Sequence, residues 1–336
     1  MSVSASPASA DAIVARAEAA IDRMAAVRAG VGRVVFGQEE VVERALVTLL
    51  SGGHGLLVGV PGLAKTRLVE TLGVVLGLTT RRIQFTPDLM PSDILGSEVL
   101  DTAADGARSF RFVEGPVFTR LLMADEINRA SPRTQSALLQ AMQEAHVTIA
   151  GRRHDLPHPF HVLATQNPLE QEGTYPLPEA QLDRFLMQID VDWPDLATER
   201  RILLETTGAA EARPEPVLAV DELVDLQRLV RLMPVGESVV EAILALVRSA
   251  RPPEAGAGAG DPARAVAWGP GPRAGQALML TVRARALLAG RLAPSLDDVI
   301  ALAEPILQHR MALTFAARAD GVSVRDVVAR LVARLG

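Results

Sequence analysis

Residues 59–66 have the residue types and the spacing of a loop that binds nucleotide phosphates. They follow an apolar, strand-like run at 55–58 and lead into a helical pattern at 67–72, which is the context this motif requires. Small residues let successive backbone N–H groups turn toward the phosphates, and the helix dipole adds to the attraction. The loop consists of Gly59, Val60, Pro61, Gly62, Leu63, Ala64, Lys65 and Thr66.

Lys65 and Thr66 are the residues of this loop whose side chains would do chemistry. Lys65 would reach the β- and γ-phosphates of ATP, and the Thr66 hydroxyl would bind Mg²⁺. Ala64 stands where the general motif has its second glycine. Because only a positive φ demands glycine, a methyl group is tolerable at Ala64 if this residue already has helical φ and ψ. The alternative interpretation is a Gly/Pro turn into a helix, with an incidental Lys and Thr.

Two adjacent carboxylates, Asp125 and Glu126, follow a short apolar run at 121–124. Such a run is typical of a strand buried on both faces of a parallel sheet, and ligands bind at the carboxyl ends of these strands. Asp125 would hold Mg²⁺, directly or through water, and Glu126 would act as general base on the attacking water. Two solvated acids at the start of a loop are the alternative.

The composition is that of an ordinary globular protein without disulfides. The 336 residues are 49% hydrophobic and 22% charged, with a net charge of −6 and no cysteine. The negative charge argues against a general nucleic-acid binder. Since neither a membrane-spanning run nor a secretory signal is evident, we expect a cytoplasmic protein that does not insert into membranes.

The order of apolar patterns predicts an α/β domain followed by a helical domain. Four runs are typical of strands: 55–58, 82–85, 121–124 and 161–165. Helical patterns lie between several of them, which predicts a parallel sheet with crossover helices. We expect an N-terminal leader and helix (1–30), an α/β ATPase core (31–194) and a helical lid (195–336), with an Ala/Gly-rich linker at 252–265.

Two hairpin patterns interrupt this alternation. The first, at 96–113, contains the turn-like pair Asp105 and Gly106. The second begins at 146, after a helical pattern at 133–145, and precedes the fourth strand. Either hairpin could be an ordinary exposed element without function.

Six motifs together make the chain resemble the MoxR family of AAA+ ATPases over about residues 34–321. They lie at 59–66, 124–130, 164–168, 182–185, 269–274 and 307–310. Alanine in the sixth place of the phosphate loop is usual in this family. The resemblance implies a P-loop NTPase sheet flanked by helices, with β-hairpin inserts and a small all-helical lid, and it implies an ATPase that uses Mg²⁺.

The resemblance also implies roles for three further side chains. Asn167 matches the first sensor, whose amide would hold the attacking water, although an Asn-Pro turn is the alternative. Arg184 matches the arginine finger that a neighbouring subunit points at the γ-phosphate, with an ion pair to Asp183 as the alternative. Arg273 matches the second sensor. Gly271 replaces the serine usual in the family and weakens the cap of that helix.

A finger that acts on a neighbouring subunit implies a ring, and the family resemblance makes that ring a hexamer. It further implies a protein client that is remodelled or activated, in complex assembly or metal-cofactor insertion, and a partner with a von Willebrand factor A domain. The hairpins resemble the helix-2 insert and the pre-sensor-1 insert of this clade. Their residues Phe110, Phe112, Arg152 and Arg153 would either contact the client or lie at solvated tips.

Two other functions are compatible with a phosphate-binding loop. A nucleic-acid-dependent motor of the same clade would share the inserts, but the net acidity, scarce aromatics and lack of a helix-turn-helix or zinc module argue against it. A nucleotide-gated scaffold would bind ATP with little turnover. The presence of Lys65, Asp125, Glu126, Asn167 and Arg184 favours an active ATPase over such a scaffold.

Overall fold

The computed structural model describes residues 10–102, 108–170, 172–207, 212–253 and 260–335. They form two compact units as far as each is described: the α/β unit, Val31–Pro216, and the helical unit, Met1–Gly30 with Val217–Gly336. This division differs from the boundaries expected from the sequence. Residues 195–216 group with the α/β unit, and the N-terminal helix groups with the C-terminal helices.

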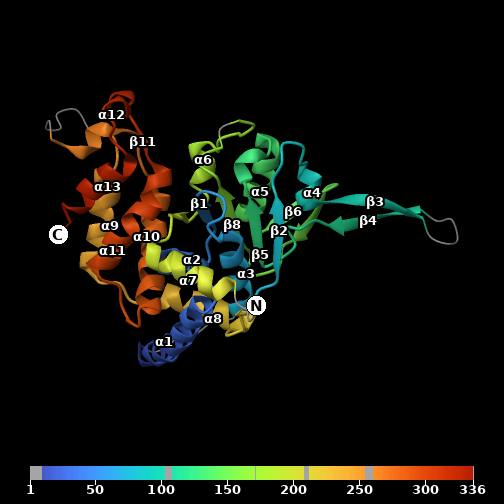
Figure 1. Cartoon of the computed structure of the whole chain (residues 1–336), viewed down its shortest axis with the longest axis horizontal. Helices are drawn as coiled ribbons and strands as arrows, with labels where there is room; N and C mark the ends of the chain where they lie inside the picture. Colours follow the sequence, from blue (N-terminus) through green and yellow to red (C-terminus); the bar gives the residue numbers. More distant parts are fainter. Residues whose placement is uncertain (1–9, 103–107, 171, 208–211, 254–259, 336) are drawn as a thin grey trace, which may run out of the picture. The chain divides into compact units, whose positions relative to one another are not determined.

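A five-stranded parallel sheet forms the centre of the α/β unit (Figure 1). In spatial order its strands are β2 (Thr80–Gln84), β5 (Leu121–Asp125), β8 (His161–Gln166), β1 (Gly55–Val58) and β9 (Met187–Asp190). Every neighbouring pair is parallel, so the carboxyl ends of the strands meet at one edge of the sheet. The predicted fold class is confirmed, although β9 was not among the predicted strands.

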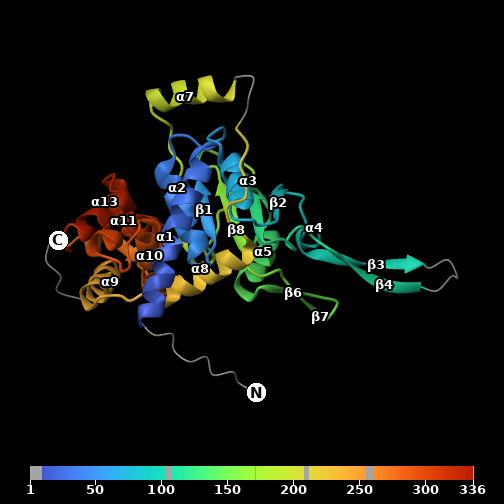
Figure 2. The same cartoon turned by 90° about the horizontal axis from the view of Figure 1, so that it is seen from below.

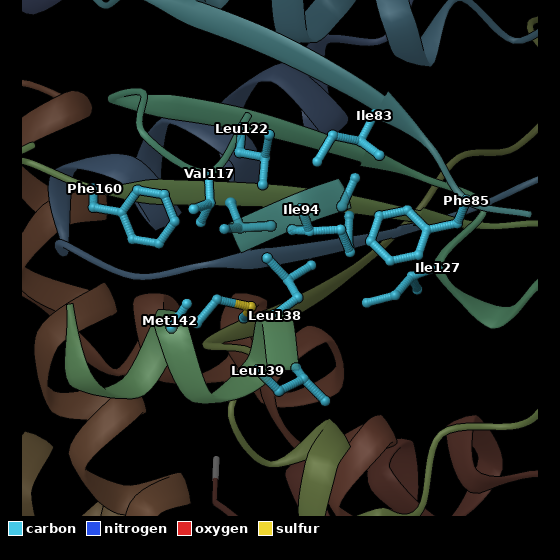
Figure 3. Close-up of a cluster of buried hydrophobic side chains, with 14 of the residues drawn as sticks. Ile83, Phe85, Ile94, Val117, Leu122, Ile127, Leu138, Leu139, Met142 and Phe160 are labelled. Carbon is cyan, nitrogen blue, oxygen red and sulfur yellow. The ribbon is translucent and has the colours of Figure 1, made fainter. Parts of the chain in front are cut away.

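One face of the sheet packs against α5 (Pro132–Glu144) in a continuous apolar core (Figure 3). Leu122 from β5 lies in this core together with Leu138 and Met142 from α5. Each such buried side chain contributes about 1.5–3 kcal/mol of hydrophobic stabilisation. The helix begins after Ser131, whose hydroxyl accepts a backbone N–H of the first turn. The core thus fixes the strand that carries the predicted acids.

The α/β unit has further helices besides α5. They are α2 (Glu39–Leu50), α3 (Lys65–Val75), α4 (Pro91–Leu95), the 3₁₀ turn η1 (Ile127–Arg129), α6 (Glu179–Leu182) and α7 (Leu196–Thr206). Helix α7 contacts the loop before α2, where the Arg201 guanidinium lies 4.4 Å from the centre of the Phe36 ring.

Both predicted hairpins are present. Strands β3 (Gly96–Thr102) and β4 (Arg108–Glu114) pair antiparallel and project beyond the sheet of their unit (Figure 2). The turn predicted at Asp105 and Gly106 lies outside the described residues. Strand β6 (His146–Ile149) pairs with β7 (Arg152–Asp155). Ala150 and Gly151 both have positive φ between them, as a tight hairpin turn requires.

The helical unit consists of packed helices with one short two-stranded sheet. Its elements are α1 (Ala10–Gly32), α8 (Val220–Leu232), α9 (Glu237–Ser249), η2 (Pro262–Ala265), β10 (Val266–Trp268), α10 (Pro272–Leu288), α11 (Leu296–Leu307), η3 (Gln308–Arg310), β11 (Ala312–Leu313), α12 (Phe315–Ala319) and α13 (Val324–Val332). Strands β10 and β11 pair antiparallel. Among the helices that the structure describes, none has the length and apolar character of a membrane span.

A buried carboxylate ties α10 to α11. Asp298 is fully buried, and its oxygens accept hydrogen bonds from Arg285 (2.6 Å), from Arg291 (2.6 and 2.8 Å) and from the backbone N–H of Ser295 (2.8 Å). Burial raises the pKa of Asp298, but the bonds from Arg291, Ser295 and Arg285 outweigh it and leave that pKa below its usual value. The carboxylate therefore stays charged and links both helices.

Candidate functional site

A cavity of about 400 Å³ lies at the carboxyl ends of β1, β2, β5 and β8. This is the edge at which open α/β sheets bind ligands. The cavity brings the end of the phosphate loop together with the predicted acids and the predicted first sensor. Its lining consists of Pro61, Gly62, Leu63, Ala64, Lys65, Thr66, Arg82, Gln84, Asp125, Glu126, Thr165 and Asn167.

The phosphate loop is closed by its own lysine. Lys65 is the first residue of α3, and its Nζ donates hydrogen bonds to the backbone oxygens of Gly59 at 2.6 Å and Val60 at 2.8 Å. A Cβ on Gly59 would lie 2.6 Å from the backbone oxygen of Val191, so only glycine fits at that position. The loop is thus a compact turn with an ammonium group at the cavity.

The helical φ and ψ under which an alanine would be tolerated without strain are absent at Ala64. Ala64 is the N-cap of α3 and has a φ of 55° and a ψ of 22°, which is left-handed rather than helical backbone. Such a conformation costs a non-glycine residue about 1–2 kcal/mol. The chain turns at Gly62, which has a φ of +87°, and again at Ala64 before the helix can start. Strain of this kind is typical of functional loops.

Lys65 carries its charge in partly desolvated surroundings. Burial lowers the pKa of the Lys65 ammonium, and the nearby carboxylates of Asp125 and Glu126 raise it in part. The net effect is a pKa below the usual value of a lysine. An ammonium group that has lost part of its hydration attracts phosphate oxygens more strongly than a solvated one does.

Asp125 is buried, and hydrogen bonds fix the orientation of its carboxylate. Its Oδ1 accepts from the Thr165 hydroxyl at 2.6 Å, and its Oδ2 accepts from Arg82 at 2.5 Å and 3.2 Å. Asp125 and the Thr66 hydroxyl both line the cavity. Hard oxygen donors of this kind, completed by substrate phosphates, are the usual ligands of Mg²⁺, so this pair fits the ion.

Glu126 follows in strained backbone, with a φ of 55°. Its N–H donates to the Thr165 hydroxyl at 2.9 Å, and its Oε2 accepts from Gln84 at 2.8 Å and from Arg129 at 3.2 Å. Both acids line the cavity, but their carboxylates have different hydrogen-bond partners. The two acids can therefore have separate tasks.

Asn167 lies at the end of β8, buried and in the cavity lining. Its Oδ1 accepts the backbone N–H of Leu169 at 3.1 Å, so the turn that the sequence also suggested is present. The turn fixes the amide oxygen. It leaves the amide nitrogen as the group that could meet a ligand in the cavity.

The cavity lining that the structure describes includes neither Arg184 nor Arg273. Arg184 is half-buried just after α6, where its backbone N–H donates to the oxygen of Gln181 at 3.2 Å. Arg273 is exposed in the first turn of α10 in the helical unit. The N-cap of that helix is Gly271, which supplies no side-chain cap.

Three cavity residues were not predicted: Arg82, Gln84 and Thr165. Arg82 and Gln84 are two apart on β2 and share one face of the strand. In the parallel register Gln84 lies opposite Asp125. The sequence did contain a signal for Arg82 and Gln84. They are polar side chains two residues apart, at the end of a strand that lies next to the strand with the acids.

Comparisons with known proteins agree with this geometry. A family model described as "ATPase family associated with various cellular activities (AAA)" matches residues 54–187, and a model of the AAA lid domain matches residues 260–331. The matched regions contain four of the five strands of the sheet, the cavity and most of the C-terminal helices. Fold and site therefore define a protein of the AAA+ ATPase class.

Individual relatives show which family of this class the chain resembles. "Chaperone MoxR1" of Mycobacterium tuberculosis is 44% identical over 302 residues, which are 90% of this chain and 79% of that protein. "Protein MoxR" of Paracoccus denitrificans is 33% identical over 304 residues, 85% of this chain and 87% of its own. A crystal structure from Cytophaga hutchinsonii, of a candidate ATPase, is 35% identical with a TM-score of 0.86, over 96% of this chain and 97% of its own. The chain belongs to the MoxR family of AAA+ ATPases.

Proposed function

We propose that this chain hydrolyses ATP in the cavity at the edge of its sheet and, within a ring, uses the energy to remodel or activate a protein client. The observation that carries the proposal is the convergence of Lys65, Asp125 and Glu126 on one cavity at the end of a phosphate loop. A cation for phosphate, a carboxylate for a metal and a second carboxylate for a proton are the groups that this reaction needs.

Each of these residues has one task in the proposed reaction. The loop N–H groups and the Lys65 ammonium bind the phosphates. Glu126 accepts the proton of the water that attacks the γ-phosphate, and Asn167 orients that water through its amide. Thr66 and Asp125 hold Mg²⁺, which neutralises the charge that develops on the phosphate oxygens.

A second subunit completes the site in this proposal. Arg184 reaches the γ-phosphate bound by a neighbouring copy, where its fixed charge stabilises the transition state. This role is supported by its absence from the lining of the cavity in its own chain. Closed rings of like subunits repeat such a contact at every interface, and we propose six subunits. Arg273 reports the nucleotide state to the helical unit.

The first hairpin is the proposed contact with the client. Phe110 on β4 is 67% exposed, and its cross-strand partner Leu100 is 51% exposed. Phe112 instead stacks on His154 of β7, with ring centres 3.9 Å apart, and joins the two hairpins. Exposed apolar side chains on a projecting hairpin favour binding of protein. A chaperone role agrees with the name of the mycobacterial relative, and a von Willebrand factor A domain protein is the partner we propose.

Turnover of ATP at increasing protein concentration tests this function. We expect turnover per wild-type subunit to rise with concentration, because the active site forms only when subunits meet. The Arg184→Ala variant should stay at the level of Lys65→Ala, which lacks the phosphate-binding ammonium. Wild-type turnover that is independent of concentration and equal in Arg184→Ala would contradict a site shared between subunits.

A further inference from the structure

Arg82 places a fixed positive charge against the carboxylate that would hold the metal. Its side chain extends from β2 to the neighbouring strand, where Nη2 lies 2.5 Å and Nε 3.2 Å from Oδ2 of Asp125. A third bond runs from Nη2 to the side-chain oxygen of Gln84 at 3.2 Å. Arginine remains protonated at every physiological pH, so only movement of its side chain can remove this charge from Asp125.

The oxygens of Asp125 are largely occupied by these bonds. Oδ2 accepts two N–H groups from Arg82, and Oδ1 accepts the Thr165 hydroxyl at 2.6 Å. A divalent cation needs the same oxygens and is repelled by the guanidinium beside them. Arg82 and a cation therefore compete for Asp125.

A nucleotide in the cavity would give Arg82 a second anion to bind. Its side chain is 49% exposed, whereas that of Asp125 is only 12% exposed, and both Arg82 and Lys65 line the cavity. A planar guanidinium binds phosphate oxygens with two parallel hydrogen bonds, as it binds a carboxylate. With a polyphosphate in the cavity, Arg82 could thus leave the Asp125 carboxylate and bind phosphate oxygens instead, at little cost in free energy.

We propose that Arg82 is a positioning residue that exchanges Asp125 for the nucleotide's phosphates and thereby makes cation binding at Asp125 depend on the nucleotide. This inference rests on the proposed function, since it takes ATP as the ligand of the cavity. It assigns Arg82 two opposite effects. Without nucleotide it keeps divalent cations off Asp125, and with nucleotide it adds to phosphate affinity.

Two binding titrations of Arg82→Gln measure these opposite effects without any turnover. Mn²⁺ binding, followed by electron paramagnetic resonance in the absence of nucleotide, should become about fivefold tighter because the competing ion pair is gone. Binding of the fluorescent analogue mant-ATP in excess EDTA should become about tenfold weaker because a phosphate ligand is gone. Arg82→Lys, which keeps the charge but not the fork, should fall between wild type and Arg82→Gln in both titrations.

Arg81 provides a matched control on the same strand. It is the preceding residue, faces the other side of β2, and donates to the backbone oxygen of Gly115 at 3.2 Å. Arg81→Gln removes the same charge and should leave both affinities at the wild-type values. Circular dichroism of all variants establishes that the fold is retained.

The direction in which Arg82→Gln changes the Mn²⁺ affinity distinguishes competition for Asp125 from simple support of its position. If Arg82 merely supported the position of Asp125, Arg82→Gln would bind Mn²⁺ more weakly, and unchanged or weaker Mn²⁺ binding overturns the inference. Unchanged mant-ATP binding overturns the exchange of partners. Wild-type protein that binds no mant-ATP would instead defeat the proposed function, and the Mn²⁺ titration would still judge the competition at Asp125.

Discussion

Replacement of Glu126 by glutamine is expected to lower ATP turnover by about 10³-fold, because an amide cannot accept the proton of the attacking water. ATP binding should persist, since the phosphate contacts come from the loop and from Lys65, and the metal position from Thr66 and Asp125. Glutamine keeps the size of the side chain and can still meet Gln84, which donates to Oε2 at 2.8 Å in the wild type. The measurement is single-turnover hydrolysis of pre-bound ATP.

Asp125→Asn is the informative companion to this variant. It should weaken Mg²⁺ binding and make nucleotide binding less dependent on Mg²⁺. Glu126→Gln should leave the Mg²⁺ dependence of nucleotide binding unchanged. If Glu126→Gln hydrolysed ATP at the wild-type rate, the proton would have another acceptor, and the division of labour between the two acids would be wrong.

The second large effect is expected on stability in mild acid. His54 directly precedes β1 and His161 begins β8. Loss of hydration lowers the pKa of His54 to about 3 and that of His161 to about 4. His54 accepts the N–H of Val162 at Nδ1 (3.0 Å), and its Nε2 meets the backbone oxygen of Met142 (3.1 Å). This pattern requires the neutral ring with its proton on Nε2, so protonation would break the bond from Val162.

The sign of the effect follows from where the protons bind. The folded pKa values lie below the unfolded value of about 6.5, so between them the unfolded chain binds more protons than the folded one. The stability that these rings contribute is complete above pH 6.5 and is lost as the pH falls toward 4. Between pH 7.5 and pH 5 we expect each ring to remove about 2 kcal/mol from the free energy of unfolding.

Urea unfolding followed by circular dichroism at pH 7.5 and pH 5 measures this loss. The pKa of the buried Asp298 is lowered, so its carboxyl titrates below this pH range and does not contribute to the loss. In His54→Gln the loss should shrink by about half, because one of the two rings is gone. His146→Gln, on the hairpin strand β6, is the control and should keep the full loss. If wild type and His54→Gln lost the same free energy of unfolding between pH 7.5 and pH 5, the His54 ring would not be a source of the loss.

Much of the fold was predictable because its strands are short apolar runs with clear ends. Gly55–Val58 forms β1 with the predicted bounds, and β5 and β8 each extend one residue beyond the prediction. Met187–Asp190 was missed because it alternates apolar and polar residues over only four positions. Helix α7 lies in the range expected for the lid, whereas in the structure it groups with the α/β unit. A contact such as that between Arg201 and Phe36 spans a distance in sequence that no local pattern reveals.

The same distinction holds for the site. Lys65, Asp125, Glu126 and Asn167 could be placed at one edge because each follows or precedes a strand, and the structure brings them to one cavity. The partner of Asp125 could not be predicted, because the pairing with Arg82 depends on the order and register of β2 and β5. The left-handed backbone of Ala64 was also missed, since it is imposed by the geometry of the loop rather than by the residue itself.

If a neighbouring subunit completes the active site, two inactive variants should restore activity to each other when they are mixed. Glu126→Gln lacks the base but keeps Arg184, and Arg184→Ala lacks the finger but keeps the base. Each alone should turn over ATP at background. In an equal mixture that reassembles at random, about one quarter of the sites combine an intact base with an intact neighbouring finger, and turnover should recover to that extent. A mixture as inactive as its components would contradict the claim.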